Sequence, residues 1–216
     1  YLTNEIAPVL DTMGYNIQIL ENPSGIAAPF LVARRIEDPS LPTVLTYGHG
    51  DVIRGLEGQW QEGRNPWQLT QVGERYYGRG TADNKGQHSI NIAALRAVLE
   101  TRGKLGFNST IMIDTGEEIG SPGLHEFARQ HRELLKADVL IGSDGPRLAP
   151  TMPTIFMGTR GALNFDLVVK FREGGHHSGN WGGLLANPAV VLCHAIAAII
   201  DAKGHVNASE LMPDAM

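Results

Sequence analysis

Hydrophobic positions up to residue 143 alternate between helical and strand spacing. Leu2, Ile6, Leu10 and Met13 recur at helical spacing, and Gly14 provides a stop signal. Short β-prone runs, separated by turn residues, predict strands at 15–20, 30–35, 43–47, 109–114 and 139–143. Helical patterns follow at 85–99 and 124–131. Strands that alternate with helices predict a mostly parallel sheet with helices on both faces, and hence an α/β domain.

From about residue 158 the pattern changes. Alternation over 162–171 predicts a strand, a Gly-rich stretch at 174–183 holds two histidines, and an apolar helix opened by Asn-Pro covers 187–201. We therefore expect a first domain over 1–157 and the beginning of a second, α+β domain over 158–216. The chain starts at Tyr1, without a methionine, so we expect sequence to be missing at both ends.

Composition and charge exclude several classes of protein. With 42% hydrophobic and 19% charged residues, the chain has the composition of a globular protein. The most apolar run, 189–200, is too short to cross a bilayer, and a net charge of −5 without a Lys/Arg cluster does not suit nucleic acid. We expect a cytoplasmic protein. A single cysteine excludes a disulfide framework and a cysteine-based zinc site, so histidine and carboxylates must hold any metal.

Potential metal ligands follow three predicted strands of this sheet, and a fourth opens a helix. The strand-end motifs are His49-Gly50-Asp51, Glu117-Glu118 and Asp144, while Asp83 lies at the start of the helix 85–99. Because the carboxyl ends of parallel strands meet at one edge, these side chains should converge. Imidazole together with carboxylate suits Zn²⁺ better than Ca²⁺ or Mg²⁺.

Each motif alone has an ordinary explanation. His49 and Asp51 can be an incidental surface pair, Glu117-Glu118 can favour the N-terminus of the next helix, and Asp144 can belong to a turn. All four motifs occur at strand or helix ends of one predicted sheet, so an ordinary explanation would have to hold for each of them separately. A single metal site explains all four at once.

Taken in order, the motifs resemble the co-catalytic zinc metallopeptidase family that includes acetylornithine deacetylase, succinyl-diaminopimelate desuccinylase, aminoacylase and carnosine dipeptidase. The matching segments are 48–51 (Gly-His-Gly-Asp), 78–80 (Gly-Arg-Gly) leading to Asp83 and Lys85-Gly86, 117–121, and Ser143-Asp144. Segments 158–161, 177–179 and 181–183 are most similar to the carnosine-dipeptidase branch. One departure is Asn84, where that branch often has a second aspartate.

The resemblance implies a pair of zinc ions, with cobalt or manganese as substitutes. His49 and Asp144 would bind the first ion, Glu118 the second, and Asp83 would bridge both. The family takes a further ligand of the second ion, a histidine, from the last part of its catalytic domain. We expect that ligand to be absent from this chain. Relatives also have a cis peptide bond after the bridging aspartate, which predicts one between Asp83 and Asn84.

Further residues take catalytic or binding roles by the same resemblance. Glu117 would be the general base, and Asp51 would orient the imidazole of His49. His177, preferred over the adjacent His176, would stabilise the oxyanion, commonly in the active site of a partner subunit. Arg160 would pair with a substrate carboxylate, although a salt bridge at the domain junction explains it equally well.

These roles predict a zinc-dependent hydrolase that cleaves an amide or peptide bond of a small, dipeptide-like substrate, using a metal-bridging hydroxide. A deacylase of N-acyl amino acids and a non-catalytic peptide-binding or subunit homologue remain alternatives. A metal-dependent phosphohydrolase fits poorly because the chain lacks a phosphate-binding glycine loop. The implied fold is a three-layer α/β catalytic domain over 1–157, lacking its C-terminal return, and part of an α+β lid over 158–216 through which a homodimer forms.

Overall fold

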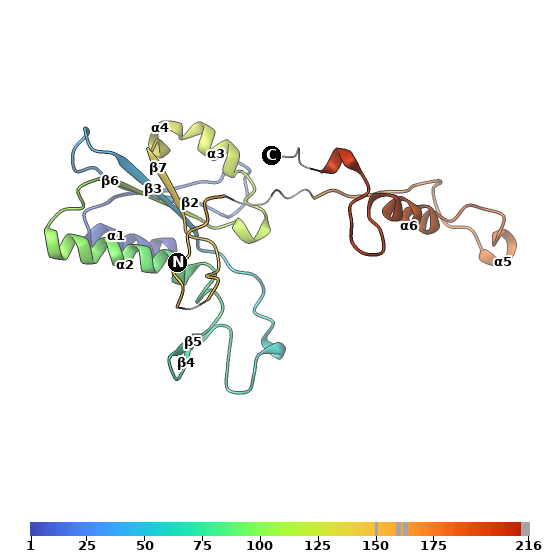
Figure 1. Ribbon diagram of the computed structural model, residues 1–216, viewed down its shortest axis with the longest axis horizontal. Coiled ribbons are helices and arrows are strands. Elements are labelled where there is room, and N and C mark those ends of the chain that lie inside the picture. The colour runs from blue at the N-terminus through green and yellow to red at the C-terminus, as the bar shows by residue number, and fades with distance from the viewer. Residues whose placement is uncertain (150, 159–160, 162–163, 213–216) are drawn as a thin grey trace. The chain divides into compact units, whose positions relative to one another are not determined.

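The computed structural model describes residues 1–149, 151–158, 161 and 164–212 of the chain (Figure 1). The chain divides into two compact units, Tyr1–Pro153 and Thr154–Met216. The domain boundary between residues 157 and 158 remains a prediction about the whole protein. Within the described residues, no helix has the length and apolar character that a membrane crossing demands.

The first unit is built on a five-stranded sheet in the order β1-β2-β6-β3-β7. Its strands are β1 (Asn16–Leu20), β2 (Phe30–Arg35), β3 (Thr43–His49), β6 (Asn108–Asp114) and β7 (Val139–Gly142). β3 pairs in parallel with both β6 and β7, whereas β2 runs antiparallel to its neighbours β1 and β6. Every strand except β2 therefore points the same way, and the predicted mainly parallel sheet is confirmed.

Helices cover both faces of this sheet, as the alternation predicted (Figure 1). A π-helical turn (Leu2–Ile6) continues into α1 (Ala7–Thr12), and α2 (Lys85–Arg102) packs with them on one face. On the other face lie α3 (Leu124–Gln130) and α4 (Arg132–Leu135). The architecture is the three-layer α/β arrangement expected from the sequence.

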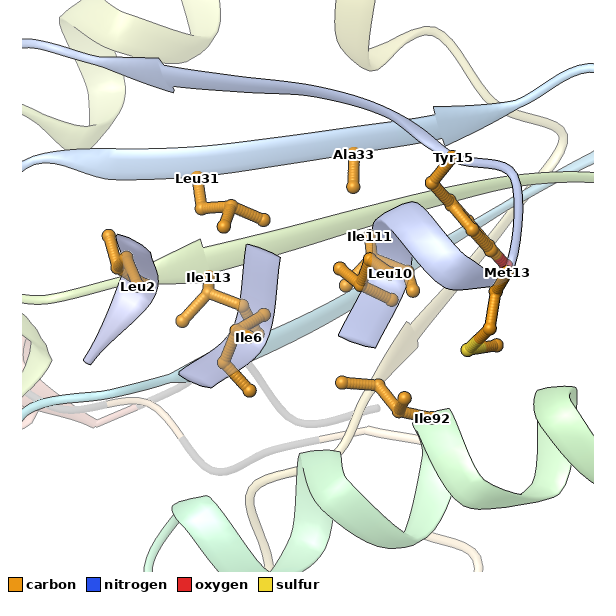
Figure 2. Packing of buried hydrophobic residues seen from close by; sticks show 10 residues of the cluster. All are labelled: Leu2, Ile6, Leu10, Met13, Tyr15, Leu31, Ala33, Ile92, Ile111 and Ile113. Carbon is orange, nitrogen blue, oxygen red and sulfur yellow. The ribbon is translucent and has the colours of Figure 1, made fainter. Parts of the chain in front are cut away.

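Successive residues of the central strands point to opposite faces and so build two cores. Leu31 and Ala33 of β2, with Ile111 and Ile113 of β6, meet the N-terminal helices and Ile92 of α2 (Figure 2). The residues between them, Phe30 and Val32 of β2 and Met112 of β6, point to the opposite face. There they form the second core with Phe127 of α3. Central strands buried on both faces read as continuous apolar runs, which explains the sequence pattern at 30–33 and 111–113.

A small hairpin was not predicted. After a 3-10 turn (Glu57–Gln59), β4 (Thr70–Val72) pairs antiparallel with β5 (Arg75–Tyr77) in a separate two-stranded sheet. Gly73 begins the two-residue turn with φ +60°, a conformation that favours glycine. The Gly-Glu pair between two short β-prone runs was the available signal.

The second unit contains α5 (Ser178–Trp181), α6 (Pro188–Ile199) and a 3-10 turn (Ser209–Leu211). The predicted apolar helix is confirmed, and the Asn187 side chain caps it by accepting the N–H of Ala189 at 2.9 Å. The strand predicted over 162–171 is wrong for its described part, 164–171, which forms no strand. Alternation produces a strand only where another strand is available to pair with it, and the described part of this unit offers none.

We expect Phe127→Ala to destabilise the intact protein strongly. The Phe127 ring is fully buried and stacks on Phe30 with ring centroids 4.2 Å apart, so truncation leaves a cavity costing about 3–5 kcal/mol. Ile90→Ala is a matched control, because Ile90 is 68% exposed on α2 and its truncation should change stability by less than about 0.5 kcal/mol. Chemical denaturation measures both, and equal effects would contradict this account of the core.

Candidate metal centre

The predicted ligands gather at the edge of the sheet where β3, β6 and β7 end. His49 is the last residue of β3, and Asp144 follows β7. The 3-10 turn Glu117–Ile119, which comes soon after β6, carries both glutamates. Asp83 directly precedes Asn84, the N-cap of α2, and the peptide bond between them is cis, as expected. Parallel pairing thus brings four separate segments of the chain to one place.

His49 lies at the centre of this cluster, with its side chain fully buried. Its Nε2 atom is 2.8 Å from Asp83 Oδ1, 3.6 Å from Glu117 Oε2 and 3.8 Å from Asp144 Oδ2. The carboxylates are partly exposed, at 66%, 36% and 34% of their side-chain surface in the same order. A buried imidazole therefore faces three carboxylates that solvent can reach.

The ligand atoms fall into two groups whose members lie within 4.8 Å of one another. One contains His49, Glu117 and Asp144, and the other contains His49, Asp83 and Glu118. Ligand atoms about 2.0–2.2 Å from a tetrahedral zinc ion are separated from each other by about 3.3–3.6 Å. The oxygens of Glu117 and Asp144, at 3.6 and 3.8 Å from His49 Nε2, lie at or close to this spacing, whereas Asp83 at 2.8 Å is hydrogen-bonded to the imidazole. The donor types suit zinc as well.

The structure brings the four predicted ligands together and adds Glu117 to them. The resemblance paired His49 with Asp144 and Glu118 with Asp83, whereas the observed groups also place a Glu117 oxygen beside His49 and Asp144. Whether Glu117 acts as base while Glu118 binds metal stays a prediction.

Asp51 contacts both the imidazole and the glutamate turn. Its Oδ1 lies 3.3 Å from His49 Nδ1, on the side of the ring opposite the cluster. The same carboxylate accepts the backbone N–H groups of Glu117 and Glu118 at 3.2 and 3.0 Å. Asp51 thus links the histidine to the turn that carries the glutamates. The sequence suggested only the first of these contacts.

The pKa values of His49 and Glu117 are shifted by burial and by the carboxylates that lie close together in the cluster. Burial alone would lower the pKa of His49, but its hydrogen bond with Asp83 and the surrounding carboxylates outweigh burial and leave that pKa raised. Burial also raises the pKa of Glu117, and Asp144 adds to this rise while His49 opposes it. Carboxylates this close repel one another, and a bound cation is the natural way to offset the repulsion.

Two glycines of the motifs are explained by close approach. A Cβ on Gly48 would lie 2.7 Å from Asn84 Oδ1 and 3.0 Å from the Cβ of His88. A Cβ on Gly86 would lie 1.9 Å from the carbonyl oxygen of Thr81, which is backbone and cannot move aside. Glycine at 48 lets the start of α2 pack directly against the end of β3, and glycine at 86 lets the first turn of α2 approach the loop that precedes it.

His88, to which the sequence pattern assigned no role, belongs to a polar network behind the cluster. Its side chain is 3% exposed, its Nδ1 lies 3.0 Å from Asn84 Oδ1, and its Nε2 lies 2.6 Å from the hydroxyl of Tyr1. Asn84 in turn contacts the backbone of His49 at 3.0 Å. No feature of the sequence distinguishes such a histidine from one in an ordinary helix, because the network joins it to Tyr1 and, through Asn84, to His49, both far away along the chain.

The remaining predicted residues, Arg160 and His177, belong to the second unit of the chain. Arg160 falls outside the described residues. His177 belongs to the second unit, where it is exposed and caps α5 by accepting the Gly179 N–H at its Nδ1. Beside the cluster, a cavity of about 160 Å³ is lined by residues that include Ile53, Arg79 and Glu118.

Comparison with known proteins agrees with this geometry. Residues 45–204 match peptidase family M20/M25/M40. The chain belongs to this family. It is 34% identical over 182 residues to a Beta-Ala-His dipeptidase of Mus musculus, covering 82% of the chain and 36% of that protein. It is 36% identical over 166 residues to the Cysteinylglycine-S-conjugate dipeptidase of Corynebacterium striatum, covering 76% of the chain and 36% of the relative. The chain thus spans about a third of the length of these relatives.

Solved structures support the fold. Human carnosine dipeptidase 1 matches with a TM-score of 0.68 and 28% identity, covering 96% of this chain and 45% of the other. The metallo-carboxypeptidase Sso-CP2 from Sulfolobus solfataricus matches with a TM-score of 0.72 over 94% of this chain and 45% of the other. At 24% identity, the second likeness concerns the fold alone. The predicted family and fold are both confirmed.

We expect His88 to make the metal-free protein less stable as the pH falls below about 6.5. Burial, with the charges of Lys85 and His49, lowers the pKa of His88 to about 4. The unfolded chain, in which histidine titrates near pH 6.5, therefore binds a proton that the folded chain excludes. Above pH 6.5 the titration of His88 costs the folded protein no stability. Between pH 6.5 and pH 4 it lowers the free energy of unfolding by at most about 1.4 kcal/mol per pH unit.

Denaturation at pH 7 and pH 5, with chelator present, measures this effect. His88→Gln cannot titrate and should lose less stability over that range than the wild-type protein. His125→Gln removes an exposed histidine and should behave like the wild type. The same pH dependence in His88→Gln and the wild type would show that His88 does not contribute.

Proposed function

We propose that the protein containing this chain is a zinc-dependent hydrolase that cleaves the peptide bond of small, dipeptide-like substrates. The observation that supports this most directly is the pair of ligand groups that share the buried His49, with Glu117 beside them. The names of the relatives support peptide substrates, since one is a Beta-Ala-His dipeptidase and another a Cysteinylglycine-S-conjugate dipeptidase. Deacylation of N-acyl amino acids is the alternative outcome of a substrate screen.

The metal ligands would be His49, Asp83, Glu118 and Asp144, with Asp83 shared between two ions. Asp83 suits this role because its carboxylate is the most exposed of those around His49, while Oδ1 contacts Nε2. Bound zinc supplies a Lewis acid for the substrate carbonyl and a water whose pKa is near neutrality. Asp51 holds the imidazole of His49 from its other nitrogen, which fixes the direction in which Nε2 points.

Glu117 would be the general base. Its Oε2 reaches within 3.6 Å of His49 Nε2, and its side chain is 36% exposed, so the carboxylate faces both the ligands and solvent. It would take the proton from the attacking water and deliver it to the leaving nitrogen.

The second unit would supply His177 to the active site of a partner subunit in a homodimer. His177 Nδ1 accepts the N–H of Gly179 at 3.0 Å, so the neutral ring carries its proton on Nε2. That proton is the one that would stabilise the developing oxyanion. His176 instead lies against Trp181, with ring centroids 5.6 Å apart, which supports the choice of His177.

The two adjacent glutamates should fail in different ways. In the full-length protein, Glu117→Gln should keep its zinc but lower kcat by at least about 100-fold, the usual scale of general base catalysis. Glu118→Gln should lose zinc. Metal analysis and a hydrolysis screen over dipeptides and N-acyl amino acids, with added Zn²⁺ or Co²⁺, measure both.

Glu133→Gln, an exposed glutamate of α4, serves as the control and should retain both zinc and activity. Equal zinc loss in Glu117→Gln and Glu118→Gln would overturn the division of roles. A wild-type protein that binds zinc but hydrolyses none of these substrates would favour the non-catalytic alternative.

Mixed dimers test the role of His177. Glu117→Gln and His177→Ala should each be inactive, but mixing them should restore part of the activity, because one active site of the hybrid receives both intact groups. His176→Ala should remain active alone. Absence of recovery despite demonstrated subunit exchange would show that His177 does not act across subunits.

A further inference from the structure

Asn84 occupies the N-cap position of α2, but its side chain makes no capping hydrogen bond. Asparagine is among the residues that most often cap a helix through the side chain, and this contact stabilises a helix by about 1 kcal/mol. Here the side chain is fully buried and turned toward the strands instead. Its hydrogen bonds must therefore serve something other than the helix.

The amide of Asn84 joins the ends of β3 and β7. Its Oδ1 accepts the backbone N–H of His49 at 3.0 Å. Its Nδ2 donates to the backbone carbonyl of Ser143 and lies 3.3 Å from Asp144 Oδ1. Because a backbone N–H can only donate and a carbonyl can only accept, these two partners fix which end of the amide is oxygen.

These two backbone groups are the ones that the next hydrogen bond of the parallel ladder would join. β3 and β7 remain paired to Tyr47 and Gly142, and the N–H of Ser143 then donates to the carbonyl of Tyr47 at 3.1 Å. In a regular parallel ladder, the following bond would run from His49 N–H to the Ser143 carbonyl. The Asn84 amide accepts from the first and donates to the second, so it stands between them.

We propose that Asn84 is a positioning residue whose amide is inserted between β3 and β7 and spreads the two strands where His49 and Asp144 emerge. The inserted amide sets the distance between these two side chains, now 3.8 Å between Nε2 and Oδ2, and with it the size of the site they form. Asn84 is fully buried, so it would act through the positions of His49 and Asp144.

The surroundings leave the amide no alternative position. Oδ1 also lies 3.0 Å from His88 Nδ1, and Nδ2 lies 2.6 Å from Gln87 Oε1. Gly48 is needed because a side chain there would run into Oδ1 at 2.7 Å. A group that both donates and accepts fills this place, whereas an alanine would leave both backbone groups unpaired or let them meet.

A crystal structure of metal-free Asn84→Ala tests the spacer directly. We expect the ladder to extend by one hydrogen bond, from His49 N–H to the Ser143 carbonyl, which draws the ends of β3 and β7 together. Strands that stay in place with a water molecule where the amide was would overturn the proposal. If Asn84→Ala does not fold, Asn84→Ser, whose hydroxyl is too short to reach both strands, is examined in its place.

Zinc and cobalt binding to the full-length protein provides the functional test, which rests on the proposed function. Asn84→Ala should bind the metal at His49 and Asp144 about 10- to 100-fold more weakly, the usual effect of losing a residue that orients a ligand. The visible spectrum of the cobalt form should change as well.

Gln87→Met is the matched control. It removes another partner of the Asn84 amide and an exposed hydrogen bond to the Gly145 carbonyl, but leaves the contacts of Asn84 with His49 and Ser143, so affinity and cobalt spectrum should stay as in the wild type. Unchanged affinity and spectrum in Asn84→Ala would contradict the proposal. A wild-type protein that binds no zinc would contradict the proposed function instead, while the metal-free crystal structure would still decide whether Asn84 separates the strands.

Discussion

Repulsion among carboxylates is the constraint on which the site depends. Asp51, Asp83, Glu117, Glu118 and Asp144 are held around one buried imidazole, and the separations of their oxygens from it leave room for cations. Packing must hold these charges together against their repulsion, because each would be better solvated apart. The two apolar cores of the first unit supply that rigidity, since they fix β2 and β6 from both faces of the sheet and hold β3 through Leu45 and Tyr47 on one face.

Hydrogen bonds to the backbone then fix the orientation of the individual side chains. One carboxylate, that of Asp51, accepts two consecutive N–H groups and so fixes the turn that carries Glu117 and Glu118. On the other side of His49, the amide of Asn84 fixes the position of the backbone. Asp51 thus holds the ring of His49, and Asn84 holds its backbone N–H.

The sequence predicted what depends on periodicity and on strand order. The strand at 30–35 was located to the residue, and the ligands at strand ends converge because parallel strands end at one edge. The prediction of a strand over 162–171 was wrong for the described residues 164–171, because a strand needs a partner strand that the sequence pattern does not specify. The network of Asn84 and His88 could not be predicted, because the hydrogen bonds that tie these two residues to Tyr1, His49 and Ser143 join positions separated by long stretches of chain. The residue pattern identified Glu117 and Glu118 only as a pair, and their separate roles came from the family resemblance.

The parallel pairing that assembles the site also bears on how the chain folds. Val44 pairs with Val139, and Thr43 with Asn108, so the strands that carry the ligands meet only after long loops have closed. Such contacts form slowly, because the entropy of loop closure is lost before the pairing compensates for it. Metal ions therefore find a complete set of ligands only once the sheet exists, and they would stabilise the finished fold rather than guide its formation.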